Sequence, residues 1–216
     1  MLRTAFLALF LCLFSTASTA KEPMRVLVMG DSFMTTNAGT RSAVPHVLEQ
    51  GLGVKVRSQA VMGARFGFNL PLTGALGMNI AKQLRAGKWD WVVLIVGGCT
   101  RCKKRLNRLI SPDGRKGSIP ATVARARASG ARVIYVGYLR SPGLGSPIEH
   151  CRKVGDALEA RIAVMAQQDP GVSFVSLADM VPHGDASFHA LDMIHPSPKG
   201  SAAAAKRVVA AIKGAQ

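Results

Sequence analysis

The chain has few aromatic and few acidic residues. Phe, Trp and Tyr together make up 6% of its 216 residues, so Leu, Val, Ile and Ala must supply most of a hydrophobic core. Only 12 residues are Asp or Glu, against 28 Lys and Arg, which gives a formal net charge of +16. Hydrophobic residues nevertheless make up 48%, which excludes a disordered or low-complexity chain. The length favours one domain and excludes a large multidomain protein.

The glycine-rich motifs that bind nucleotides are also missing. The sequence contains no Walker A pattern and no GxGxxG after its first predicted strand, so a nucleotide-binding function has no support. Its basic residues are not interleaved with the aromatic residues on which single-stranded nucleic acids stack. We therefore expect no nucleic acid partner.

The first 20 residues have the composition of a secretory signal peptide. Arg3 supplies a positive charge, residues 5–14 are almost wholly apolar, and residues 18–20 are small, as signal peptidase requires. The apolar stretch is too short for a membrane anchor, which needs about 20 residues, and no second stretch could span a bilayer. We therefore expect a soluble domain over residues 21–216 that is periplasmic or secreted.

Five short apolar or alternating segments predict β-strands, and longer segments with helical periodicity lie between them. The predicted strands cover residues 24–30, 54–60, 89–96, 131–137 and 172–177. The predicted helices cover about residues 41–50, 72–86, 101–110, 120–128, 147–167 and 201–213. Because strands alternate with helices, we expect a five-stranded parallel sheet covered on both faces, in one three-layer α/β/α sandwich. Ligands of such folds bind beyond the carboxyl ends of the strands.

A Gly-Asp-Ser sequence at residues 30–32 follows the first predicted strand. A serine at such a turn can expose its hydroxyl at the carboxyl edge of the sheet, with its own N–H directed at a developing oxyanion. The alternative is structural, because Ser and Asp are common N-caps of helices.

Asp192 and His195 lie three residues apart near the other end of the chain. In a turn, this spacing places the carboxylate beside the imidazole. The carboxylate can then orient the ring and stabilise its cation, while the other ring nitrogen faces a nucleophile. Such a pair alone is weak evidence, because it also arises in surface loops. Together with Gly-Asp-Ser at the opposite end of an alternating five-strand domain, it is far more specific.

In this order, the motifs resemble those of the SGNH/GDSL hydrolases over about residues 24–212. The resemblance implies the flavodoxin-like SGNH hydrolase fold and a serine esterase that needs no metal and no organic cofactor. It implies that Ser32 is the nucleophile, that His195 is the general base and then the general acid, and that Asp192 orients the imidazole.

The resemblance also implies an oxyanion hole. Its donors would be the N–H of Ser32 and the N–H of a glycine after the second strand, for which Gly63 is a better match than Gly67. Residues predicted to contact substrate at the same edge of the sheet are Asp31, Gly98, Tyr138 and Arg140.

The third family motif is where this sequence departs from the pattern. Cys99 stands where the family has an asparagine that donates a side-chain N–H to the oxyanion, and a thiol is a poor donor. Loss of one such donor typically lowers turnover by about 100- to 1,000-fold. Thr100 and Asn107 are candidates to replace it. The protein could alternatively be a weak or inactive member of the family.

Cys99, Cys102 and Cys151 remain after removal of the leader. They fit a redox CxxC pair, a zinc site that includes His150, or a structural disulfide between the loop after the third strand and Cys151. An exported chain favours the disulfide, and adjacent His and Cys residues are awkward zinc ligands. We therefore expect a disulfide and no bound metal.

A dense basic cluster follows this loop, formed by Arg101, Lys103, Lys104, Arg105 and Arg108. It is either an ordinary solvated helix face or a rim that attracts anionic groups to the site.

Two histidines near the C-terminal end of the chain also allow more than one interpretation. His183 and Asp185 could form a second dyad or only a turn, and His189 could line the site or fill a loop.

The sequence thus favours an exported esterase acting on an ester-bearing small molecule, a lipid or an envelope glycan. O-acyl glycans, lysolipids and small esters all fit, and acyl transfer to a sugar is an alternative to hydrolysis. A second hypothesis is a catalytically weak or inactive SGNH-like protein that binds an anionic envelope glycan.

Overall fold

Strands and helices alternate along the chain, as the sequence pattern predicts. The structure is a computed structural model and describes residues 22–67, 72, 76–95, 103–143 and 145–216. Strands β1 to β5 cover Val26–Met29, Val56–Ser58, Trp91–Ile95, Arg132–Val136 and Val172–Val175. Helices α1, α2 and α4 to α7 cover Ser32–Thr35, Val44–Leu52, Lys103–Leu109, Ser118–Ala128, Arg152–Gln167 and Pro198–Lys213. The 3-10 turns η1 to η3 cover Ile80–Gln83, Glu149–Cys151 and Ala186–Phe188.

The five strands form one parallel sheet in the order β2-β1-β3-β4-β5. Val26 of β1 pairs with Val56 of β2 on one side and with Trp91 of β3 on the other. The direction in which the chain adds strands reverses at β1 and β3. In open parallel sheets, ligands bind beyond the carboxyl ends of the strands at such a switch point. The turn that carries Ser32 begins there.

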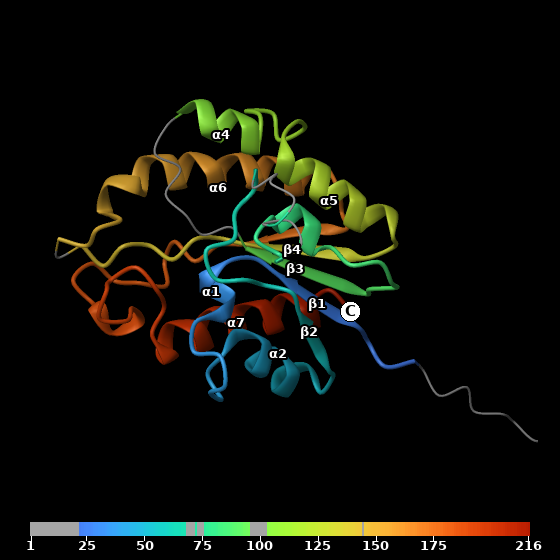
Figure 1. Ribbon diagram of the computed structural model, residues 1–216, viewed down its shortest axis with the longest axis horizontal. Coiled ribbons are helices and arrows are strands. Elements are labelled where there is room, and N and C mark those ends of the chain that lie inside the picture. The colour runs from blue at the N-terminus through green and yellow to red at the C-terminus, as the bar shows by residue number, and fades with distance from the viewer. Residues whose placement is uncertain (1–21, 68–71, 73–75, 96–102, 144) are drawn as a thin grey trace, which may run out of the picture.

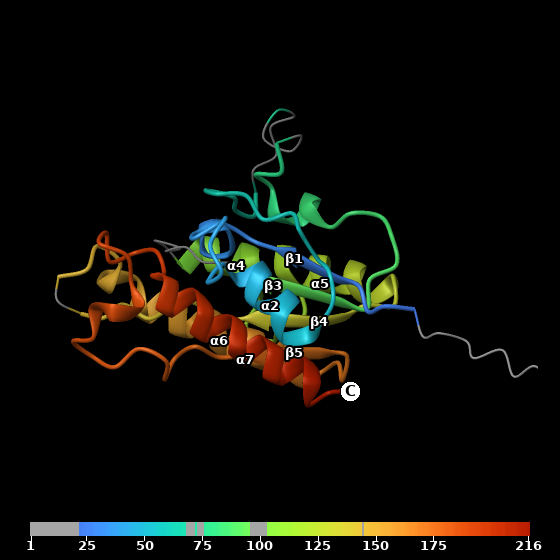
Figure 2. The same cartoon turned by 90° about the horizontal axis from the view of Figure 1, so that it is seen from below.

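Side chains of β1, β3 and β4 point alternately into two separate hydrophobic cores. From β1, Leu27 and Met29 enter the core beneath α4, α5 and α6, whereas Val26 and Val28 enter the core above α2 and α7 (Figure 1). All four side chains are fully buried. Helices α2 and α7 lie side by side on their face of the sheet (Figure 2). The predicted three-layer α/β/α sandwich is therefore confirmed.

The predicted helix over residues 72–86 is not continuous. Leu72 is helical, but no described residue from 76 to 86 is in an α-helix. That part contains the 3-10 turn η1, and the side chain of Asn79 caps its start. Gly77, just before this cap, has a φ of +74°, a left-handed conformation that glycine adopts without steric cost and a right-handed helix excludes. Ile80 and Gln83 are both buried. A spacing of three residues between buried side chains is also expected of a longer α-helix.

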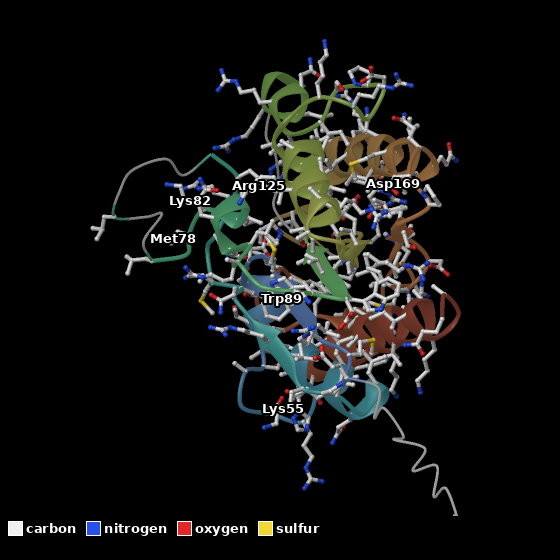
Figure 3. All side chains as sticks on the ribbon, turned by 90° about the vertical axis from the view of Figure 1, so that its right-hand side faces the viewer. Lys55, Met78, Lys82, Trp89, Arg125 and Asp169 are labelled. Atoms are coloured by element: carbon white, nitrogen blue, oxygen red, sulfur yellow. The ribbon has the colours of Figure 1, made fainter. Side chains whose placement is uncertain are left out.

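The turn η1 is held against α5. Arg125 Nη1 donates a hydrogen bond to the carbonyl of Ala81 at 3.2 Å, and Figure 3 labels Lys82 and Arg125 close to this contact. The packing places Gln83, at the end of η1, within hydrogen-bonding distance of the turn that follows β1. A segment with no recognisable motif thereby supports the candidate nucleophile.

Several predictions fall outside the described residues and stay predictions. They are the signal peptide over residues 1–20, the substrate contact assigned to Gly98, and the roles discussed for Cys99, Thr100 and Cys102. Of the helices that the structure does describe, none is long and apolar enough to cross a lipid bilayer.

Candidate active site

The turn between β1 and α1 places Ser32 at the carboxyl edge of the sheet. Gly30 has a φ of +150°, and a Cβ there would lie 2.7 Å from Ile95 Cγ2, so a larger residue would collide with β3. Asp31 is the N-cap of α1 and accepts a hydrogen bond from Phe33 N at 3.0 Å. The capping role that the sequence left open for Ser32 therefore belongs to Asp31. The Ser32 hydroxyl is not used as a cap.

Gln83 holds this turn from a distant part of the chain. It is only 1% exposed. Its side-chain oxygen accepts from Gly30 N at 2.7 Å, and its amide nitrogen donates to Gly30 O at 2.9 Å and to Gly77 O at 2.8 Å. Sequence reasoning missed Gln83 because it lies 53 residues from Gly30 and belongs to no motif.

Asp192 and His195 form a closely hydrogen-bonded pair in the loop before α7. His195 Nδ1 lies 2.6 Å from Asp192 Oδ2. The other carboxylate oxygen accepts the backbone N–H groups of Ile194 at 2.9 Å and His195 at 3.0 Å. The backbone turns through Met193, which has a φ of +53°. With Nδ1 directed at the carboxylate, Nε2 is the ring nitrogen available to a substrate or a nucleophile.

The carboxyl group of Asp192 is strongly acidic. Desolvation alone would raise its pKa, but the hydrogen bonds from the His195 ring and from the N–H groups of His195 and Ile194 outweigh it and lower the pKa to about 2. Asp192 is therefore a carboxylate at neutral pH. A permanent anion beside the imidazole orients the ring and stabilises its protonated form.

Ser32 and His195 line one cavity of about 340 Å³, which we name the Ser32 cavity. Its walls come from α1, α4, α6 and the loops after β2, β4 and η3. Within the described chain, no hydrogen bond joins the Ser32 hydroxyl to the imidazole. In structures without substrate such contacts are often long, and they tighten when substrate binds. The two side chains come from opposite ends of the sequence and face the same space.

Gly63 lies in the wall of the Ser32 cavity, and Gly67 does not. Gly63 has a φ of +74°, so glycine suits this position. Neither Ser32 N–H nor Gly63 N–H donates a hydrogen bond to any described residue. Two N–H groups without acceptors at a shared cavity are the arrangement that an oxyanion hole requires. Asn107, suggested as a further donor, is not in the wall, and its side-chain oxygen accepts from Arg161 at 2.7 Å.

Of the predicted substrate contacts, Asp31 and Tyr138 line the Ser32 cavity and Arg140 does not. Arg140 is instead held by two acidic residues of α6, with Nη2 2.7 Å from Glu159 Oε2 and Nη1 3.0 Å from Asp156 Oδ1. Its guanidinium lies over the Tyr138 ring, 4.0 Å from the ring centre. Arg140 therefore packs on Tyr138, a wall residue, and does not itself line the cavity.

The same cluster fixes Tyr138. Its N–H donates to Glu159 Oε1 at 2.9 Å, and its hydroxyl donates to Asp156 Oδ1 at 2.7 Å. Burial raises the pKa of Glu159, although the neighbouring Arg140 cation opposes the effect. Burial and the hydrogen bond to Asp156 raise the pKa of Tyr138, so the phenol is a neutral donor. Tyr138 presents a fixed ring to the cavity.

The second possible dyad is not formed. Asp185 caps η3, where it accepts from Ser187 N at 2.8 Å, and it lies 3.6 Å from Lys199 Nζ.

His189 is only 6% exposed and is not in the wall of the Ser32 cavity. Neither of its ring nitrogens has a partner among the described residues, and burial lowers its pKa. His189 therefore fills the loop that carries His195.

Comparisons with known proteins agree with this geometry. The sequence profile of the GDSL-like lipase/acylhydrolase family matches residues 28–203. A structure assigned as an SGNH hydrolase from Slackia heliotrinireducens is 26% identical, with a TM-score of 0.61, over 88% of this chain and 99% of that one. The comparison with curated proteins found no significant match.

Two more distant structures share the fold. TesA is 22% identical, with a TM-score of 0.63, over 89% of this chain and 100% of its own. A carbohydrate esterase family 2 enzyme from Corynascus thermopiles is 16% identical, with a TM-score of 0.55, over 91% of this chain and 68% of its own. The family profile spans most of the sequence and confirms the resemblance drawn from the motifs. The protein therefore belongs to the GDSL-like lipase/acylhydrolase family and has the SGNH hydrolase fold.

Proposed function

We propose that the protein is a serine ester hydrolase that acts through an acyl-enzyme. One observation carries the proposal: Ser32 shares a cavity with His195, whose Nδ1 lies 2.6 Å from Asp192. A hydroxyl, a base and a carboxylate that orients the base are the parts that activate a serine nucleophile. The N–H groups of Ser32 and Gly63, on the same cavity, support the assignment.

The reaction follows from the roles of these groups. His195 Nε2 accepts the Ser32 hydroxyl proton while Oγ bonds to the ester carbonyl carbon. The resulting oxyanion receives hydrogen bonds from the N–H groups of Ser32 and Gly63. The imidazolium then gives its proton to the departing alkoxide, which leaves as an alcohol. Water, deprotonated by the same imidazole, attacks the acyl-enzyme and releases the acid and the serine.

The proposal includes three chemical classes of ester. O-acyl glycans, lysolipids and small esters all present a carbonyl that can reach Ser32 from the cavity. The structural likeness to a carbohydrate esterase is consistent with a glycan ester as substrate. At 16% identity, this likeness is evidence for the shared fold. Acyl transfer uses the same acyl-enzyme, with a sugar hydroxyl in place of water.

We also propose that the protein is exported and that Cys151 forms a disulfide with a cysteine of the loop after β3. Cys151 is 8% exposed, at the end of η2, and lines the Ser32 cavity, so the bridge would tie that loop to α6. Mass spectrometry of protein secreted by cells should show an N-terminus near Lys21 and a mass two hydrogens lower than that of the reduced chain. An intact leader or three alkylatable thiols would contradict the proposal.

The catalytic proposal is tested with the wild type, Ser32→Ala and His195→Ala on 4-nitrophenyl acetate and butyrate. Both variants should lose at least about a thousandfold in kcat, because the members of such a unit act together. Labelling by a fluorophosphonate should occur in the wild type and fail in Ser32→Ala. An unlabelled wild type with no activity would favour the second candidate, a glycan-binding protein on a hydrolase scaffold.

A further inference from the structure

The Ser32 cavity has an apolar inner wall and a basic opening. Leu109 of α4, Leu139 after β4 and Leu158 of α6 line it and are 7%, 5% and 4% exposed. Arg65 and Arg105 also line it, but their side chains are exposed. The hydrocarbon therefore forms the inner wall and the two cations lie where the cavity opens to solvent.

Arg105 lies on α4 one turn before Leu109, so both residues face the same side of the helix. Among the described carboxylates, none lies within ion-pair distance of Arg105. By contrast, Arg127, Arg140 and Arg207 each have an acidic partner within 3.0 Å. Of the two cluster side chains that the structure describes, Arg105 lines the cavity and Arg108 does not, and no described acid lies within ion-pair distance of Arg105.

In the described wall, no exposed acid lies beside Arg105. Asp31 is the acidic residue that lines this part of the cavity, and it is 4% exposed and engaged with Phe33 N. A guanidinium group at the mouth of an apolar cavity creates a positive potential that favours an anion. The apolar wall beside it favours a hydrocarbon chain.

We propose that the substrate is an amphiphilic ester whose acyl chain lies against Leu109, Leu139 and Leu158 and whose alcohol part carries an anionic group bound by Arg105. This inference rests on the proposed ester hydrolysis and adds the class of ester. The acyl chain occupies the apolar interior, and the alcohol that leaves from Ser32 points to the mouth.

The test compares 4-carboxyphenyl hexanoate with 4-carbamoylphenyl hexanoate, two esters of similar shape that differ in charge. The wild type should prefer the carboxylate about tenfold in kcat/KM, through KM, because a charge-assisted hydrogen bond to Arg105 is formed in the bound state. A third ester with a phosphate in place of the carboxylate distinguishes carboxylate from phosphate as the preferred anion. The preference should weaken with added salt.

Arg105→Gln should abolish most of the preference for the carboxylate ester over the carbamoyl ester. Arg108→Gln is the matched control, because it removes the same charge from the same helix and Arg108 does not line the cavity. A wild type with no preference, or equal losses in the two variants, would overturn the proposal. Binding of the carboxylate ester to Ser32→Ala protein, measured by calorimetry with and without Arg105→Gln, gives a result even if no hydrolysis occurs. Intact, Arg105-dependent binding with no turnover would show that only the catalytic proposal had failed.

Discussion

Asn37 binds the backbone of Pro196 across 159 residues of sequence. Its amide nitrogen lies 3.2 Å from the Pro196 carbonyl and 2.9 Å from the Ser201 hydroxyl. Asn37 follows the helix that begins with Ser32, and Pro196 directly follows His195. This side chain therefore joins the turn of the proposed nucleophile to the loop of the proposed base. Its left-handed backbone, with a φ of 64°, directs the amide at both acceptors.

The first prediction concerns this link. Asn37→Gly keeps a residue that tolerates the positive φ but removes both hydrogen bonds. We expect it to lower the free energy of unfolding by about 1 to 2 kcal/mol and to lower kcat, because the imidazole loses a fixed position relative to Ser32. Urea unfolding and 4-nitrophenyl butyrate kinetics provide the measurements. Asn37→Ala should be less stable than Asn37→Gly, because it adds backbone strain. Wild-type kinetics in both variants would show that the link does not position the site.

A second prediction concerns Gln83, which supports the turn before Ser32. Gln83→Met keeps the approximate volume and removes the side-chain hydrogen bonds. Gly30 N then loses its acceptor, whereas Gly30 O still accepts from Val61 N. Because a buried unsatisfied group costs roughly 1 to 3 kcal/mol, we expect a loss of that size in unfolding free energy and a lower kcat. The exposed neighbour Lys82 provides the control, since Lys82→Ala should change stability by less than about 0.5 kcal/mol. Equal stabilities of the two variants would refute this role.

A third prediction follows from the pKa of Asp192. Folding lowers it from 3.8 to about 2, so the folded state favours the carboxylate. The stability that this group contributes is present above pH 4 and is lost as the pH falls through about 2. In urea titrations, the stability difference between the wild type and Asp192→Asn should therefore shrink over that window. The side chain is 45% exposed, so solvent screens the effect. A difference independent of pH would contradict the assignment.

The same substitution should also affect catalysis. Asp192→Asn removes the anion that orients His195, and comparable changes in serine hydrolases lower kcat on the order of 10⁴-fold. Labelling of Ser32 by a fluorophosphonate should slow in proportion, because it requires the same base. Normal labelling rates in Asp192→Asn would show that His195 is oriented by other contacts.

A fourth prediction uses the contact between Gly155 and Tyr138, both in the wall of the Ser32 cavity. A Cβ at position 155 would lie 2.4 Å from the Tyr138 ring, which Asp156 and Arg140 hold in place. Gly155→Ala should therefore force the ring into the cavity and lower kcat/KM for octanoate esters about tenfold relative to acetate esters. Adding Tyr138→Ala should restore the preference for long chains. An unchanged chain-length profile in Gly155→Ala would place the acyl chain elsewhere.

The parts of the fold that are encoded locally could be predicted from the sequence. Short apolar or alternating segments identified all five strands, because buried strands are apolar on both faces and edge strands on one face. The pairing of Asp192 with His195 followed from a spacing of three residues. The helix over residues 72–86 could not be excluded, because Ile80 and Gln83 are buried for reasons that involve distant partners.

Contacts between distant segments account for the remaining differences. The sequence places Arg140 at the correct edge of the sheet, where it reads as a substrate contact. Its guanidinium turns instead to two carboxylates of α6, 16 and 19 residues further along the chain. Pairings of this kind depend on how α6 packs against the sheet, which no local pattern specifies.

The hydrogen bonds between Asp192 and His195 close within four consecutive residues, whereas the position of Ser32 relative to them depends on the whole sheet. Partial unfolding should therefore separate the hydroxyl from the imidazole while the acid–base pair is still intact. At moderate urea concentrations, the enzyme should stop turning over before the downfield proton resonance of the His195 ring disappears.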